Sequence, residues 1–253
     1  RIEDGNPAAV ALRTHYAQNS YISHCDIHIG NGKAGIFDVG NEIENVRFFG
    51  GDYGIYTTKT SPAWPFMMVD TYFENQRKAA VRSREAGLTV VRMQVKNVPV
   101  VFETDTNHHE KLYVEDSQFE NVPDAALIIS SEQNSHNQIN LRNVDMHNVP
   151  NIAYFRESKK STPGEGGIYK VKTFVHGRQI DHLGMRPETK TVVDIEKMDE
   201  LSDTVRSDIP RLPDTDEWVS IRSFGAKGDG VSDDTEAFRN AIEKHRVIYL
   251  AQG

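Results

Sequence analysis

Carboxylates and imidazoles gather in one short stretch of the sequence, residues 103–110. Glu103 and Asp105 point the same way if they belong to one strand, because side chains on a strand alternate between its faces. Two carboxyl groups on one surface are what glycoside hydrolysis needs, one as an acid and one as a base. We therefore take Glu103, Asp105 and His108 as candidate substrate-binding residues. A solvated polar turn is the alternative interpretation of the same residues.

Metal and cofactor chemistry find little support in the residue types. His108 and His109 are neighbours, which places them on opposite faces of an extended chain and argues against a paired metal site. Cys25 is the only cysteine of the sequence. It can form neither an intrachain disulfide nor a cysteine zinc site, and we interpret it as a small buried apolar residue. We expect no metal and no other cofactor.

Aromatic and basic side chains flank an irregular insertion at residues 57–65. Tyr53, Tyr56 and Trp64 are candidates for stacking on sugar rings, since an aromatic ring offers a flat apolar surface. Packing in the core explains these three residues equally well. The basic residues that follow are Lys78, Arg82 and Arg84. They would suit proton abstraction and charge neutralisation on an acidic sugar, and a solvated charged face is the interpretation we favour for them.

A repeat must position these candidates. An apolar residue, any residue, and then Asn or Gly recur every 20 to 27 residues, as Ile29–Asn31, Phe49–Gly51, Phe73–Asn75, Val95–Asn97, Phe119–Asn121 and Met146–Asn148. Three of these phrases continue as Asn-Val-Pro. The alternation of apolar and polar residues before the Asn, clearest over residues 91–95, predicts a strand, and a second short strand follows each turn.

A period in the low twenties with two or three short strands per unit is typical of a parallel β-helix, in which each coil stacks on the next. The recurring Asn suits the turns, because Asn tolerates left-handed backbone and its amide can hydrogen-bond to the next coil. The Leu-x-x-Leu-x-Leu pattern of a leucine-rich repeat is missing. We predict an all-β fold, a right-handed parallel β-helix, with clear coils at about residues 8–156 of a first domain at 1–193.

Two further segments follow that domain. Residues 194–216 are acidic, hold two prolines and show little periodicity, which predicts an inter-domain linker. Residues 217–253 begin with glycines that permit tight turns, and Asp233 with Glu236 predicts a capping box at the start of a helix. The expected apolar stripe of that helix is Ala237, Phe238, Ala241 and Ile242.

Residues 218–238 closely resemble the opening motif of the pectate-lyase-like β-helix superfamily. Such a motif after an earlier β-helix implies two β-helices in tandem, with the first packed against the rest of the second. That arrangement resembles the exo-β-1,3-glucanases. Residues 11–20, followed by Gly35-Ile36-Phe37, resemble a second motif of that family. We expect the natural chain to extend past both Arg1 and Gly253.

The resemblance implies inverting hydrolysis of a neutral β-glucan in the cleft between the two β-helices. Gln18 matches a glutamine that helps to place the attacking water. His15 stands where the family has its other glutamine, and Asn41 lies in the turn where the family has a serine. The three are therefore candidate catalytic residues, and the general acid is expected beyond residue 253. The resemblance also implies an extracellular or periplasmic location.

Composition narrows the partners. The net charge of −8 argues against nucleic acid, and no apolar run approaches the roughly 20 residues of a membrane span. It also argues weakly against an acidic polysaccharide, unless a local basic groove overrides the average. Two alternatives to the glucanase therefore stay open. One is a polysaccharide lyase or epimerase acting on an acidic glycan, and the other is a non-catalytic stalk like a tailspike or adhesin.

Overall fold

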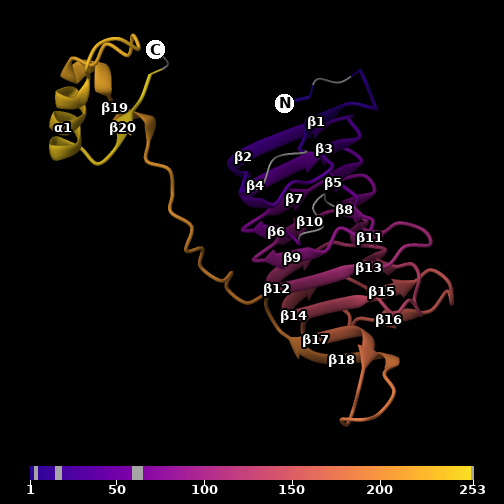
Figure 1. Cartoon of the computed structure of the whole chain (residues 1–253). Coiled ribbons are helices and arrows are strands. Elements are labelled where there is room, and N and C mark those ends of the chain that lie inside the picture. The colour runs from indigo at the N-terminus through magenta and orange to yellow at the C-terminus, as the bar shows by residue number, and fades with distance from the viewer. Residues whose placement is uncertain (3–4, 15–18, 59–64, 252–253) are drawn as a thin grey trace. The chain divides into compact units, whose positions relative to one another are not determined.

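The computed structural model describes residues 1–2, 5–14, 19–58 and 65–251. The chain divides into two compact units, Arg1–Asp208 and Ile209–Gly253, and each is described here by itself. Stacked, nearly parallel strands make up most of the first unit (Figure 1). The prediction of an all-β parallel β-helix is confirmed.

One wall of the first unit is a sheet with eight described strands. Their order is β1 (Val10–Arg13), β3 (Ala34–Phe37), β5 (Tyr53–Tyr56), β8 (Ala79–Ser83), β11 (Val100–Thr104), β13 (Ala125–Ile129), β15 (Asn151–Phe155) and β16 (Ser161–Pro163). All neighbours from β1 to β15 pair in parallel, as successive coils of a solenoid must. We call this sheet the eight-stranded wall.

The remaining strands of the first unit form a second, bent sheet. They are β2 (Tyr21–Gly30), β4 (Glu42–Gly50), β6 (Phe66–Val69), β7 (Tyr72–Glu74), β9 (Leu88–Val91), β10 (Gln94–Lys96), β12 (Lys111–Glu120), β14 (Gln138–His147), β17 (Ile168–Gln179) and β18 (Glu188–Met198). Each coil turns within this sheet at a residue of positive φ: His24, Asn45, Asp70, Arg92, Asp116 and Asn143. The bend gives each coil three straight segments, in agreement with the predicted two or three short strands.

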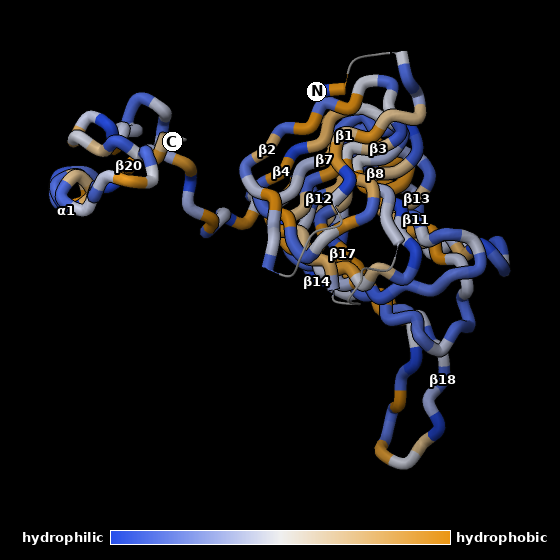
Figure 2. Tube along the Cα trace, turned by 45° about the horizontal axis from the view of Figure 1, so that its top comes forward, coloured by the Kyte–Doolittle hydropathy of each residue, from blue (hydrophilic) through white to orange (hydrophobic). Residues whose placement is uncertain are grey.

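The core is a continuous column of apolar side chains inside the coils. Hydrophobic segments recur along the strands of successive coils, whereas the loops are mostly hydrophilic (Figure 2). Phe48 and Phe73 are fully buried and stacked, with ring centroids 4.6 Å apart. A Cβ on Gly54 would lie 2.4 Å from the ring of Phe73, so this position needs glycine. The repeat therefore places side chains of similar type above one another in successive coils.

The recurring asparagines occupy the turns that lead into the eight-stranded wall. Asn75, Asn97, Asn121 and Asn148 all have φ between +54° and +62°. Their side chains form a ladder, in which Asn97 donates to Asn75 over 3.3 Å, Asn121 to Asn97 over 2.9 Å, and Asn148 to Asn121 over 2.9 Å. Both predicted roles of these residues, left-handed backbone and hydrogen bonding between coils, are confirmed.

The parallel coils end at β15. After it β16 pairs antiparallel with β15, and β17 pairs antiparallel with both β14 and β18. A register shift between Val171 and Thr173 places Phe174 in the core in place of Val175, so strict alternation fails there. β18 runs to Met198, so the first five residues of the expected linker are strand. Residues 157–193 thus add antiparallel strands to the first domain and no further coil.

His176 on β17 is buried and neutral in character. Its Nε2 donates to the carbonyl of Glu132 over 3.0 Å, so its Nδ1, 2.9 Å from the Thr191 hydroxyl, accepts. Burial lowers the pKa of His176 below 6.5, although the hydrogen bond to Glu132 acts in the opposite direction. The unfolded chain therefore binds this proton more readily than the folded chain.

We expect the free energy of unfolding to fall as the pH drops from about 6.5 towards the lowered pKa of His176. Urea unfolding at several pH values between about 7.5 and 5 measures this slope. His176→Asn is expected to reduce it, whereas His182→Asn, which changes an exposed histidine, should leave it unchanged. Equal slopes in wild type and His176→Asn would contradict the assignment.

The second unit is small. It contains the 3-10 turns η1 (Thr215–Glu217) and η2 (Ile221–Phe224), the paired strands β19 (Val219–Ser220) and β20 (Ile248–Tyr249), and helix α1 (Thr235–Lys244). The predicted capping box is wrong. Asp234 is the N-cap, without a side-chain cap bond, and its carboxylate accepts from Lys227 and Gly228 instead. Glu236 pairs with Arg239.

The expected apolar stripe of α1 is present only in part. Ala237 and Ala241 are buried against η2, whereas Phe238 and Ile242 are exposed. None of the described helices is long and apolar enough to cross a membrane.

Candidate functional site

Four of the predicted site residues lie together on the outer surface of the eight-stranded wall: Tyr53, Tyr56, Glu103 and Asp105. Rings and cations alternate on this surface around Phe37, Tyr53 and Tyr56. The cations within 6 Å of these ring centroids are Arg13, Lys33, Lys78 and Arg82. We call these seven residues the cation–aromatic face. Lys33 Nζ lies 4.8 Å from the centroids of both Phe37 and Tyr56.

Strand register creates this face. Arg13 pairs with Phe37, Phe37 with Tyr56, Tyr56 with Arg82, and Arg82 with Glu103, so that one outward row runs across five coils. Neighbouring strands in a sheet lie about 4.8 Å apart, which is the right distance for a cation to rest on a ring of the next coil. The repeat therefore converts residues about twenty positions apart into direct neighbours.

Arg82 is the centre of the face. Its Nη1 donates to the Tyr53 hydroxyl over 2.8 Å, and its Nε contacts Asp105 over 2.5 Å. Burial disfavours the charged guanidinium, but the hydrogen bonds to Tyr53 and Asp105 and the charge of Glu103 outweigh it and raise the pKa of Arg82. Arg82 therefore stays a cation and does not suit proton abstraction.

The predicted carboxylates are both held by arginines. Glu103 Oε1 accepts from Arg156 over 2.9 Å, and Asp105 is bound by Arg82. The expectation that both side chains point the same way required a continuous strand, but β11 ends at Thr104 and Asp105 lies just past it. Both carboxylates are nonetheless ion-paired in this structure.

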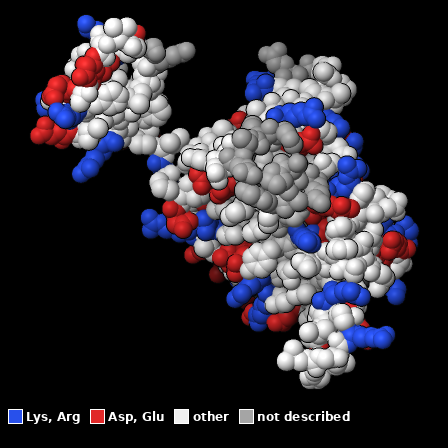
Figure 3. Space-filling model, viewed as in Figure 1, with Lys and Arg blue, Asp and Glu red and all other residues white. Residues whose placement is uncertain are grey.

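The rim of the face is also ion-paired. Lys78 and Arg77 both contact Asp52 over 2.7 Å. Burial alone would raise the pKa of Asp52, but the hydrogen bonds from Lys78 and Arg77 prevail and lower it. Arg13 contacts Asp38 over 3.3 Å. Basic and acidic side chains are likewise interspersed over the visible surface of this unit (Figure 3).

The histidines do not behave as predicted. Residues 105–110 form a turn and not an extended strand, so His108 and His109 both face Glu85. Their Nδ1 atoms lie 2.8 Å and 3.6 Å from Glu85 Oε1, and His109 packs on His136 with ring centroids 5.0 Å apart. No group of three or more ligands able to hold a metal ion is found among the described residues. His108 is separate from the cation–aromatic face.

Of the residues predicted to be catalytic, only Asn41 lies among the described residues. His15, Gln18 and Trp64 lie outside the described residues. The backbone carbonyl of Asn41 accepts a hydrogen bond from the Met67 N–H over 3.0 Å, which gives Asn41 a role in the pairing of coils. The candidate roles of these residues stay predictions.

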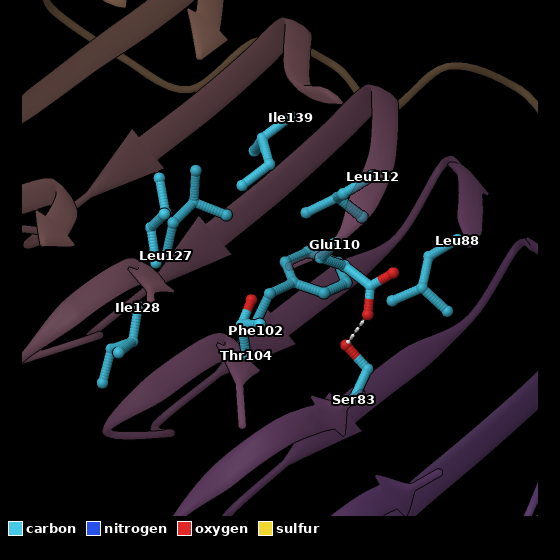
Figure 4. A pocket seen from close by; sticks show the side chains of 10 residues that line it. Ser83, Leu88, Phe102, Thr104, Glu110, Leu112, Leu127, Ile128 and Ile139 are labelled. Carbon is cyan, nitrogen blue, oxygen red and sulfur yellow. Dashed lines mark hydrogen bonds between the residues drawn. The ribbon is translucent and has the colours of Figure 1, made fainter. Parts of the chain in front are cut away.

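A small cavity lies among the core side chains inside the coils and is too small to bind a substrate (Figure 4). Its volume is about 10 Å³, which is room for one water molecule at most. Glu110 and Ser83 face each other at its edge, 2.6 Å apart, and the other walls are mainly apolar, with Leu88, Phe102 and Leu127 among them. A substrate has no access to this cavity.

Three residues of the outer surface described above were not predicted as site residues: Lys33, Phe37 and Arg156. The turn phrases do not align Phe37, Tyr56 and Arg82, and only the strand register of the structure makes them neighbours. Insertions between the turns hide that register, since the steps vary from 20 to 27 residues.

Two comparisons with known proteins match only a short part of the chain. Residues 218–253 match the family described as rhamnogalacturonase A/epimerase, pectate lyase-like. A stretch of 35 residues is 51% identical to the preneck appendage protein of Bacillus phage PZA, and it covers 14% of this chain and 4% of that protein. Together with the stacked parallel coils, the family match supports a pectate-lyase-like β-helix. This agrees with the superfamily resemblance of residues 218–238.

Proposed function

We propose that this chain belongs to a carbohydrate-active protein and that its cation–aromatic face binds an acidic polysaccharide. The observation that carries the proposal is the alternation of rings and cations on one rigid surface. The partly exposed rings of Phe37 and Tyr56 offer apolar surface to the C–H faces of sugars, Tyr53 is buried beside them, and the cations offer partners to uronate carboxylates. A local basic surface of this kind overrides the net charge of −8.

Lys33 is the cation best placed to meet a sugar carboxylate. No acidic side chain among the described residues lies within ion-pair range of its Nζ, whereas Arg13, Lys78 and Arg82 each have a carboxylate partner. Residues 218–253 match a family described as rhamnogalacturonase A/epimerase, and a galacturonate-containing polymer, as that description suggests, would be acidic. Acidic polysaccharides of this kind occur outside the cytoplasm, so we also propose an extracellular or periplasmic location.

Among reactions on such a polymer, an elimination with Arg82 as its base is one that we do not favour. A lyase needs a base that removes a proton from carbon, and the raised pKa of Arg82 disqualifies the central cation of the face. Glu103 and Asp105 are the carboxylates nearest to Arg82, and we assign them to holding the cations in place.

We expect Lys33→Gln to weaken binding of polygalacturonate about fivefold, because one exposed ion pair contributes up to about 1 kcal/mol. Affinity electrophoresis in gels that contain polygalacturonate measures the dissociation constant. Lys244→Gln is the matched control, since Lys244 also lies over a ring, that of Phe224, but in the second unit. Binding that is unaffected by Lys33→Gln, or no binding by wild type, would refute the proposal.

Hydrolysis of a neutral β-glucan with inversion is the competing prediction, and it rests on the resemblance of residues 11–20 and 35–37 to the exo-β-1,3-glucanases. Release of glucose from laminarin, first as the α-anomer, by a protein that includes the complete second β-helix would favour it. Loss of that activity on replacement of Gln18 would assign the water-placing role.

A non-catalytic appendage is a second candidate function, favoured by the identity to the phage preneck appendage protein over 35 residues. Such a stalk would bind its glycan without releasing sugar. Incubation with polygalacturonate and laminarin, followed by an assay for reducing ends, distinguishes a non-catalytic appendage from a hydrolase. Binding without any new reducing ends favours the appendage.

A further inference from the structure

A groove runs over the asparagine ladder, at the corner where the bent sheet turns into the eight-stranded wall. Its volume is about 520 Å³, within the range of small-ligand sites. Its described lining residues are Gln76, Asn97, Val98, Pro99, Asn121, Pro123 and Asn148. We call it the asparagine groove. Its lining residues differ from those of the cation–aromatic face.

The ladder amides keep hydrogen-bonding capacity for a ligand. In the middle of the ladder, Asn97 and Asn121 each use one N–H and one lone pair towards their neighbours. A primary amide has a second N–H and a second lone pair. Asn97 and Asn148 are exposed, so these remaining donors and acceptors are available at regular intervals of roughly 4.8 Å.

Gln76 supplies an independent indication of a ligand. Its side chain is 2% exposed, and its Nε2 lies within 3.2 Å of the carbonyls of Phe48, Gly50 and Glu74. Its Oε1 is buried and has no hydrogen-bond partner among the described residues, although Gln76 lines the groove. A buried acceptor without a donor is rare in native proteins and asks for one. A hydroxyl group is a donor of the right kind.

The lining defines the ligand chemistry. No lining residue among those described is charged, so the groove offers a carboxylate or phosphate no ion pair. Pro99 and Pro123 present apolar surface beside the amides, which suits a ligand with alternating C–H and O–H groups. The amides repeat along the solenoid, which suits a repeating polymer. We infer that the asparagine groove binds a neutral glycan strand, as a second carbohydrate site that is independent of the proposed function.

Blocking the groove tests this inference. Pro123 is exposed and lines the groove, whereas Pro150 is exposed at the same position of the next Asn-Val-Pro turn and does not line it. We expect wild type to be retarded in gels that contain laminarin, galactomannan or dextran, in at least one of the three. Pro123→Arg should weaken that binding at least tenfold, and Pro150→Arg should leave it unchanged. Thermal unfolding by circular dichroism checks that both variants are folded.

Several outcomes would overturn the inference. These are the absence of retardation by all three neutral polymers, equal effects of Pro123→Arg and Pro150→Arg, and a wild-type dimer in sedimentation velocity that only Pro123→Arg dissociates, which would make the groove a contact between copies. Lys33→Gln separates this site from the other one. It should weaken polygalacturonate binding and leave binding of the neutral polymer intact, so that either proposal can fail alone.

Discussion

Replacing Glu110 by alanine is expected to lower the free energy of unfolding of the solenoid by about 3–5 kcal/mol. Glu110 is 2% exposed and its carboxylate joins two coils. It accepts from the Ser83 hydroxyl over 2.6 Å, from the N–H groups of Gly87 and Lys111 over 2.9 Å and 3.0 Å, and from that of Ala86 over 3.3 Å. Alanine would leave these donors without their acceptor in an interior where water does not replace it.

Urea unfolding followed by circular dichroism measures this effect. Glu110→Gln keeps one acceptor oxygen but turns an NH₂ group towards backbone donors, so we expect a loss of roughly half that of the alanine variant. Glu165→Ala is the control for removing an exposed carboxylate and should change the free energy of unfolding by less than about 0.5 kcal/mol. A loss below about 1 kcal/mol in Glu110→Ala would show that the bonds contribute little.

Asn121→Ala is expected to cost about 2–4 kcal/mol. Two ladder bonds are lost, at about 1 kcal/mol each. Alanine must also adopt a φ of +54°, and the left-handed conformation costs a residue with a Cβ about 1–2 kcal/mol. Asn121→Gly removes the ladder bonds but tolerates the backbone, so its loss should be smaller by about 1 kcal/mol.

Denaturant unfolding of the two variants side by side separates the backbone contribution from the ladder contribution. Equal losses in Asn121→Ala and Asn121→Gly would mean that the positive φ carries no cost at this turn. Asn134→Ala changes an asparagine outside the ladder and gives the reference for loss of a local turn bond.

The repeat made the coils predictable because each unit repeats its own local chemistry. The phrase that ends in Asn marks a turn of positive φ whatever the coil around it, and three of the four ladder asparagines carry the Asn-Val-Pro signature. The antiparallel end was hidden, because an apolar strand such as β17 can pair in either direction and only its partners distinguish the two. The N-cap of α1 was misplaced by one residue because Asp233 and Asp234 have equal cap propensity.

Individual residues of the candidate site could be predicted from the sequence, but the surface that they form together could not. Tyr53, Tyr56, Glu103 and Asp105 were singled out by type, yet Arg82 joins them through partners 23 and 29 positions away. Such contacts depend on strand register, which the unequal insertions between turns conceal. The two histidines next to Asp105 were misplaced for the opposite reason, since the alternation rule was applied to a segment that is a turn.

The hairpin of β17 and β18 has a consequence for aggregation. A solenoid that ended in a bare parallel coil would offer a second molecule an edge shaped to continue the stack. Here the outermost strand, β18, runs antiparallel to the hairpin partner that precedes it and carries both signs of charge along its length, from Glu188 and Lys190 to Glu196 and Lys197. β18 runs in the same direction as the coils, since β14 and β18 are both antiparallel to β17, so strand direction alone would not prevent stacking. An incoming coil would, however, have to desolvate these charges. At this end, the charges of β18 therefore oppose growth into a fibre.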